Sequence, residues 1–67
     1  MNQAQYFNKA RDMFKQGYQW YDFLDCYPPS CIKNDVVSPL RIGRVLTKIS
    51  NQSISAYVIA LYIVTSF

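Results

Sequence analysis

Cys26 and Cys31 are the two side chains of this 67-residue chain best suited to covalent chemistry. Four residues, two of them consecutive prolines, separate the cysteines. In an oxidising compartment the thiols can join as a disulfide that closes a small loop, and in a reducing compartment they stay free on either side of a turn. The sequence leaves both states open. Two cysteines without any histidine are too few ligands for tetrahedral zinc, so we expect no metal and no other cofactor.

Groups able to act as catalysts are scarce in the chain. It has neither histidine nor glutamate, which are the usual general bases. Its four carboxylic acids are aspartates, and none belongs to a pattern typical of an activated nucleophile. A chain of this length also has little material for the walls of a substrate pocket. We therefore expect a non-catalytic protein without a small-molecule substrate.

Three basic side chains stand at spacings of three and four residues, which places them on one face of a helix. Such a row fits the phosphate groups of lipids or a face that is simply solvated. Three charges form a weak footprint for nucleic acid, which we disfavour as a partner. No acidic residue follows Asp35. The predicted contact with lipid headgroups consists of Arg41, Arg44 and Lys48.

Aromatic residues are concentrated in the first half of the chain, where eight of the eleven lie between Tyr6 and Tyr27. Tryptophan and tyrosine offer a large apolar area with a polar tip, as interface residues often do. The alternative is that they pack against the chain's own second helix. A small core covers little surface, so we favour a partner. The predicted partner interface is Tyr6, Met13, Phe14, Trp20 and Tyr21.

The elements that position these groups can be read from periodicity. Apolar residues recur every three or four positions through the first part of the chain, which predicts one amphipathic helix over residues 3–25. Gly17 interrupts this helix at a cost of about 1 kcal/mol relative to alanine. Pro28 and Pro29 then end it and open a loop over residues 26–38.

A second helix is predicted over residues 39–50, because Ser38 is a good N-cap and Pro39 suits the first helical position. The last fourteen residues, 54–67, carry no charge and are apolar on every side. We expect them to form a third helix, which Ser50 or Ser53 would cap.

A helix of fourteen residues rises about 21 Å, whereas the hydrocarbon core of a bilayer is about 30 Å thick. The basic residues before it and its lack of a polar face nevertheless favour association with a membrane, as a single-pass or an interfacial helix. If it crosses, the N-terminus and the basic helix lie on the cytoplasmic, matrix or stromal side. The alternative is a buried helix in a wholly soluble fold.

The sequence thus predicts an all-α chain, with residues 1–67 as one small unit of two amphipathic helices, a proline-rich loop and an apolar C-terminal helix associated with a membrane. The function we expect is that of a non-catalytic accessory subunit, which packs against other subunits of a hetero-oligomeric membrane complex. Small helical accessory subunits are common in the membranes of energy-transducing organelles. This frequency, and no residue of the chain, points to an organelle inner membrane such as the mitochondrial one. The alternative is a soluble three-helix module that binds a protein or, less favoured, nucleic acid.

Overall fold

The computed structural model describes residues 1–33 and 37–65 of the chain. Within these residues the fold has four α-helices and one short 3-10 helix, with no strand, which confirms the prediction of an all-α protein. Residues 34–36 of the predicted loop and the last two residues of the predicted C-terminal helix lie outside the described residues.

The first predicted helix is wrong in one respect, because it is two helices. Helix α1 spans Gln3–Lys15 and helix α2 spans Trp20–Cys26. Between them Gly17 adopts a φ of +97°, a conformation that side chains with a Cβ disfavour. The Gly17 amide donates to the Phe14 carbonyl and the Tyr18 amide donates to the Met13 carbonyl, which is a Schellman ending. The glycine therefore ends a helix rather than interrupting one.

The proline-rich segment after α2 includes a short turn of helix. The 3-10 helix η1 spans Pro29–Cys31, with its first position taken by a proline that lacks an amide hydrogen. The amide of Lys33 and the carbonyl of Met1 are hydrogen-bonded at 3.0 Å, and the amino group of Met1 donates to the carbonyl of Cys31 at 2.9 Å. The start of α1 is therefore tied to the end of η1.

Helix α3 spans Pro39–Ser50 and begins as its cap signals indicate. The Ser38 hydroxyl accepts a hydrogen bond from the Arg41 amide at 3.2 Å. At the other end Asn51 has a φ of +58°, the left-handed conformation in which asparagine is often found, and its amide donates to the Thr47 carbonyl.

After Asn51 the chain turns back and runs along α3. The Thr47 hydroxyl donates to the Ile54 carbonyl at 3.2 Å and accepts from the Ile54 amide at 3.0 Å, so one side chain satisfies both backbone groups. Gly43, one turn earlier, has no side chain to hold the returning chain away. A Cβ at that position would lie 3.2 Å from the Ile54 carbonyl oxygen. This close approach brings the chain to the start of α4.

Helix α4 spans Ala56–Thr65 and begins two residues after the start of the expected helix over residues 54–67. Its cap is Ser55, whose hydroxyl accepts from the Val58 amide at 3.3 Å, rather than Ser50 or Ser53. Ile54 is drawn into the contact with α3 and so stays outside the helix. None of the helices in the described part of the chain is long and apolar enough to cross a membrane.

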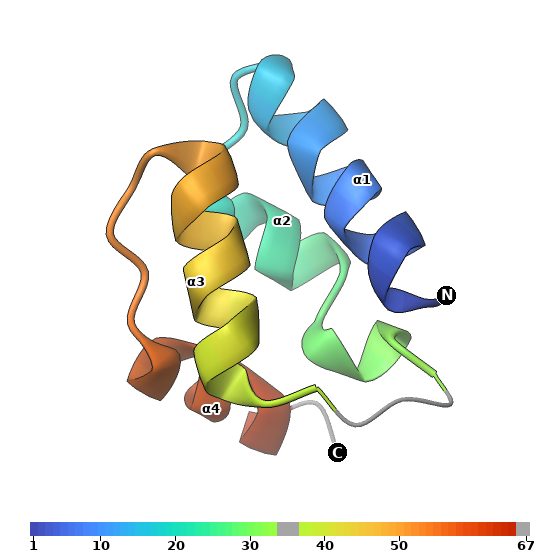
Figure 1. Cartoon of the computed structure of the whole chain (residues 1–67), viewed down its shortest axis with the longest axis vertical. Coiled ribbons are helices and arrows are strands. Elements are labelled where there is room, and N and C mark those ends of the chain that lie inside the picture. Colours follow the sequence, from blue (N-terminus) through green and yellow to red (C-terminus); the bar gives the residue numbers. More distant parts are fainter. Residues whose placement is uncertain (34–36, 66–67) are drawn as a thin grey trace.

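Helices α1 and α3 lie side by side and run in the same direction, with α2 packed behind them and α4 crossing the lower end of α3 (Figure 1). The hydrogen bond from Arg41 to Gln3 joins the first turns of α1 and α3. One buried core receives side chains from all four α-helices, from Ile32 just after η1 and from Ile54 just before α4. Its members are Tyr6, Ala10, Phe23, Leu24, Ile32, Ile42, Leu46, Ile54 and Ile59.

Replacing Thr47 by valine tests the link between α3 and the returning chain. Valine keeps the shape of threonine but removes the hydroxyl, which leaves the amide and carbonyl of Ile54 without this partner. We expect Thr47→Val to lower the free energy of unfolding by about 1–2 kcal/mol in urea titrations. Thr47→Ser keeps the hydroxyl and should cost less. A valine variant as stable as the serine variant would contradict this role of the hydroxyl.

The tyrosine at the centre of the core makes stability depend on pH. Tyr6 is fully buried and its hydroxyl donates to the Tyr27 carbonyl at 2.7 Å. Burial raises the pKa of Tyr6 above its ordinary value, and the charge of a Cys31 thiolate adds to the effect. The folded chain then keeps this proton at a pH where the unfolded chain, with a tyrosine pKa of about 10, loses it.

The stability that Tyr6 contributes is thus fully present below about pH 10 and decreases as the pH rises beyond it. Tyr6→Phe should lower the free energy of unfolding by about 1 kcal/mol at neutral pH. It should also flatten the decrease that the natural chain shows between about pH 9 and pH 11. Urea titrations of both chains across this range measure the two effects. Equal slopes would mean that Tyr6 titrates normally.

Candidate interaction surface

Helix α4 turns one apolar face away from the core. Tyr57, Leu61 and Val64 are spaced four and three residues apart, so they share one side of the helix. Their exposed fractions are 73%, 49% and 69%. Ile59 lies on the opposite side and is completely buried. Large apolar side chains grouped in this way on a helix are typical of a surface that contacts a partner.

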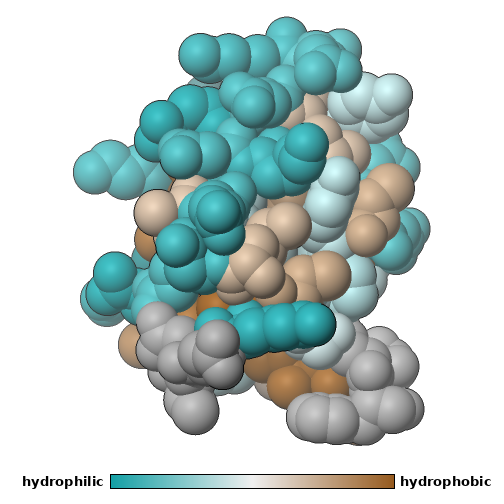
Figure 2. Space-filling model, turned by 90° about the vertical axis from the view of Figure 1, so that its right-hand side faces the viewer, coloured by the Kyte–Doolittle hydropathy of each residue, from teal (hydrophilic) through white to brown (hydrophobic). Residues whose placement is uncertain are grey.

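Leu40, in the first turn of α3, continues this apolar region beside the start of α4. It is 54% exposed and borders a shallow hollow whose other walls include Ile54 and Ala56. We call these four exposed side chains, Leu40, Tyr57, Leu61 and Val64, the α4 surface. Figure 2 shows strongly hydrophobic atoms gathered at the lower end of the molecule, where α4 lies, and hydrophilic atoms at the upper end.

The predicted basic row lies along α3 next to the α4 surface. Arg41, Arg44 and Lys48 are all exposed, as their spacing indicates. Arg44 and Leu40 line two hollows together, one shared with Arg41 and one shared with Lys48. Arg41 also donates from its Nε to the side-chain oxygen of Gln3 at 3.1 Å. The row therefore places positive charge at the edge of an apolar region.

A hydrogen bond joins α4 to α2 on another side of the helix. The Tyr62 hydroxyl donates to the Asp25 carboxylate at 3.3 Å. Partial burial raises the pKa of Tyr62, and the charge and hydrogen bond of Asp25 raise it further. This contact lies away from the residues of the α4 surface and leaves them exposed.

The five residues of the predicted partner interface do not form one exposed surface. Tyr6 is completely buried in this structure and packs its ring 4.9 Å from that of Phe23. Met13, Phe14 and Trp20 are half-buried against the core, and Tyr21 is 46% exposed. Six of the eight aromatic residues in the first half of the chain are buried in the core or packed against it, namely Tyr6, Phe7, Phe14, Trp20, Phe23 and Tyr27.

The two cysteines lie on different helices. Cys26 ends α2 and is exposed, while Cys31 ends η1 and is half-buried. Both are free thiols in this structure, and their pairing in an oxidising compartment stays a prediction. Among the described residues, no three side chains of the types that bind metal ions stand close enough together to hold one.

Comparisons of the chain with protein-family models, with curated proteins and with solved structures find no match.

Sequence analysis missed the residues of the α4 surface, although a signal for them was present. Residues 54–67 are apolar all round, so a small fold that buries one side of this segment must expose another. Periodicity identifies a stripe only where polar residues mark the opposite side. Here nothing in the pattern distinguishes Ile59, which is buried, from Leu61, which is half exposed.

Proposed function

We propose that this chain is a non-catalytic accessory subunit that docks on a larger protein assembly through the α4 surface. The observation that carries the proposal is the exposed apolar face formed by Tyr57, Leu61 and Val64 on one side of α4. In water such a face is unfavourable, at about 25 cal/mol for each square ångström of apolar area. Contact with a partner would remove that area from water.

A central apolar group with a polar rim is the usual arrangement of a protein interface. The α4 surface supplies the apolar centre, and Arg41 and Arg44 supply positive charge at its edge. The lack of histidine and glutamate, together with shallow rather than enclosed hollows, supports binding over catalysis.

A membrane setting adds a role for the basic row. A ten-residue helix is about 15 Å long, so α4 would lie at a bilayer surface or within neighbouring subunits rather than cross on its own. Arg41, Arg44 and Lys48 would then face anionic lipid headgroups. An organelle inner membrane, for example the mitochondrial one, is proposed only because small accessory subunits are common there.

The alternative is an interaction module that binds its protein partner away from membranes. A wholly soluble fold predicts a buried helix over residues 54–67, whereas α4 lies at one end of the fold with a face exposed. Both functions use the α4 surface, and they differ in where the partner resides. Nucleic acid is the less favoured partner, because the basic row has only three charges.

Substitutions on α4 test the proposal in the native source. The tagged chain is purified in mild detergent and its co-purifying proteins are quantified. The double variant Tyr57→Ser and Leu61→Ser should reduce their recovery about tenfold or more, because it removes two side chains from the centre of the interface. Tyr18→Ser is the matched control, since Tyr18 is 51% exposed and lies outside α4; it should leave recovery unchanged.

Alkaline carbonate extraction of the same source separates the two settings. Retention in the membrane pellet with a constant set of partners supports the membrane complex, and release together with those partners supports the alternative. The double variant and Tyr18→Ser could both recover the same amount of co-purifying protein as the natural chain. In that case the α4 surface is not the docking site and the proposal fails.

A further inference from the structure

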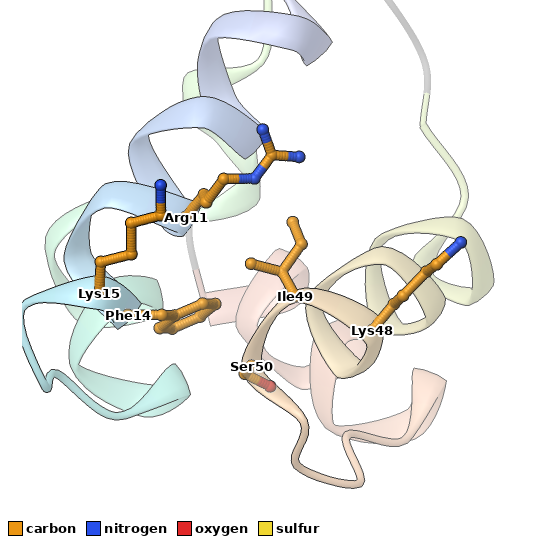
Figure 3. Close-up of a pocket in the computed structure, with 6 residues that line it drawn as sticks. All are labelled: Arg11, Phe14, Lys15, Lys48, Ile49 and Ser50. Carbon is orange, nitrogen blue, oxygen red and sulfur yellow. The ribbon is translucent and has the colours of Figure 1, made fainter.

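A second surface lies between α1 and α3 at the end of α3 that is farther from the α4 surface. It is a cleft of about 460 Å³ with six lining residues, three from each helix (Figure 3). From Leu40 to Ile49 the rise along α3 is about 13 Å, so the two surfaces occupy opposite ends of one helix. The lining residues are Arg11, Phe14, Lys15, Lys48, Ile49 and Ser50.

Basic residues from both helices line this cleft. Arg11 and Lys15 stand one turn apart on α1, and Lys48 is in the last turn of α3. No carboxylate is among the lining residues. Since α1 and α3 run in the same direction, their C-terminal ends meet here. The partial negative charge of those ends favours lysine in each last turn, but it does not account for Arg11, which lies a full turn earlier.

The floor of the cleft is apolar. Phe14 points from α1 toward α3, and Ile49 rises between the two helices (Figure 3). Both side chains are half-buried, so each keeps part of its apolar surface open to solvent. The Ser50 hydroxyl accepts from the Gln52 amide at 3.2 Å and has its own hydrogen to donate. The cleft thus offers an apolar strip bordered by cationic groups.

We propose that this cleft binds an acidic, amphipathic segment of a partner protein. The cations stand on both sides of the floor, with Lys48 directed away from the α1 side in Figure 3. Since the basic residues come from two helices, an extended segment can offer a carboxylate to each side of the floor. An apolar side chain between those carboxylates would cover Phe14 and Ile49. Double-stranded nucleic acid would use the charges and leave the apolar floor unmatched.

The cleft contains none of the four side chains of the α4 surface, although Lys48 also borders the hollow beside Leu40. Binding here is therefore measured on the purified full chain with a probe rather than by recovery of native partners. The probe is a short fluorescein-labelled peptide in which glutamate alternates with leucine. Two companion peptides replace every glutamate by serine, or every leucine by serine.

Fluorescence anisotropy should show binding of the glutamate–leucine peptide, and it should weaken as salt is added. Lys15→Gln and Lys48→Gln should each reduce affinity about threefold, as expected for one exposed ion pair. Lys9→Gln is the matched control: it removes the same charge from the same helix, where Lys9 lies near the Tyr27 ring instead of the cleft. It should leave the affinity within about a factor of 1.5 of that of the natural chain.

Three outcomes would overturn the proposal. The first is no binding of the glutamate–leucine peptide. The second is equal binding of the peptide without leucine, or equal competition by single-stranded DNA, which would mean that the cleft recognises charge alone. The third is equal loss of affinity in Lys9→Gln and Lys15→Gln, which would mean that net charge, and not this cleft, attracts the peptide. Circular dichroism of each variant verifies that it is folded.

Discussion

The return of the chain onto α3 is the contact on which the rest of the structure depends. Thr47 holds both backbone groups of Ile54, and Gly43 lets the backbone approach to a distance that a side chain would obstruct. The returning backbone would otherwise leave polar groups half-buried and unpaired beside a hydrophobic core. With Ile54 held in this way, α4 starts at the lower end of α3 and crosses it there.

That placement decides how an almost wholly apolar helix is divided between core and surface. Ile59 enters the core and Tyr62 reaches Asp25 on α2, so Tyr57, Leu61 and Val64 are left on the outer side. A chain of 67 residues has too few elements to cover both sides of α4. The α4 surface follows from this shortage.

The parallel arrangement of α1 and α3 has a separate consequence for charge. Two helices running in the same direction bring their C-terminal ends together, and the basic residues that suit such ends come together with them. The basic side chains of α3 near its first turn lie instead beside the α4 surface. Helix α3 therefore carries basic residues at both ends, next to the α4 surface at one end and next to an apolar cleft at the other.

The sequence by itself determined the helical class, the cap at Ser38, the exposure of the basic row and the scarcity of catalytic groups, because each depends on residue type or on local spacing. It identified Gly17 as an unfavourable residue within a helix. It did not show that the glycine ends a helix, since the amphipathic spacing continues on both sides of Gly17. Only the tertiary structure decided that Tyr6 is buried while Tyr57 is exposed, and that Arg11 and Lys48 border one cleft. The physical reason is that burial, and the proximity of charges distant in sequence, depend on which helices pack together. Local periodicity does not specify that packing.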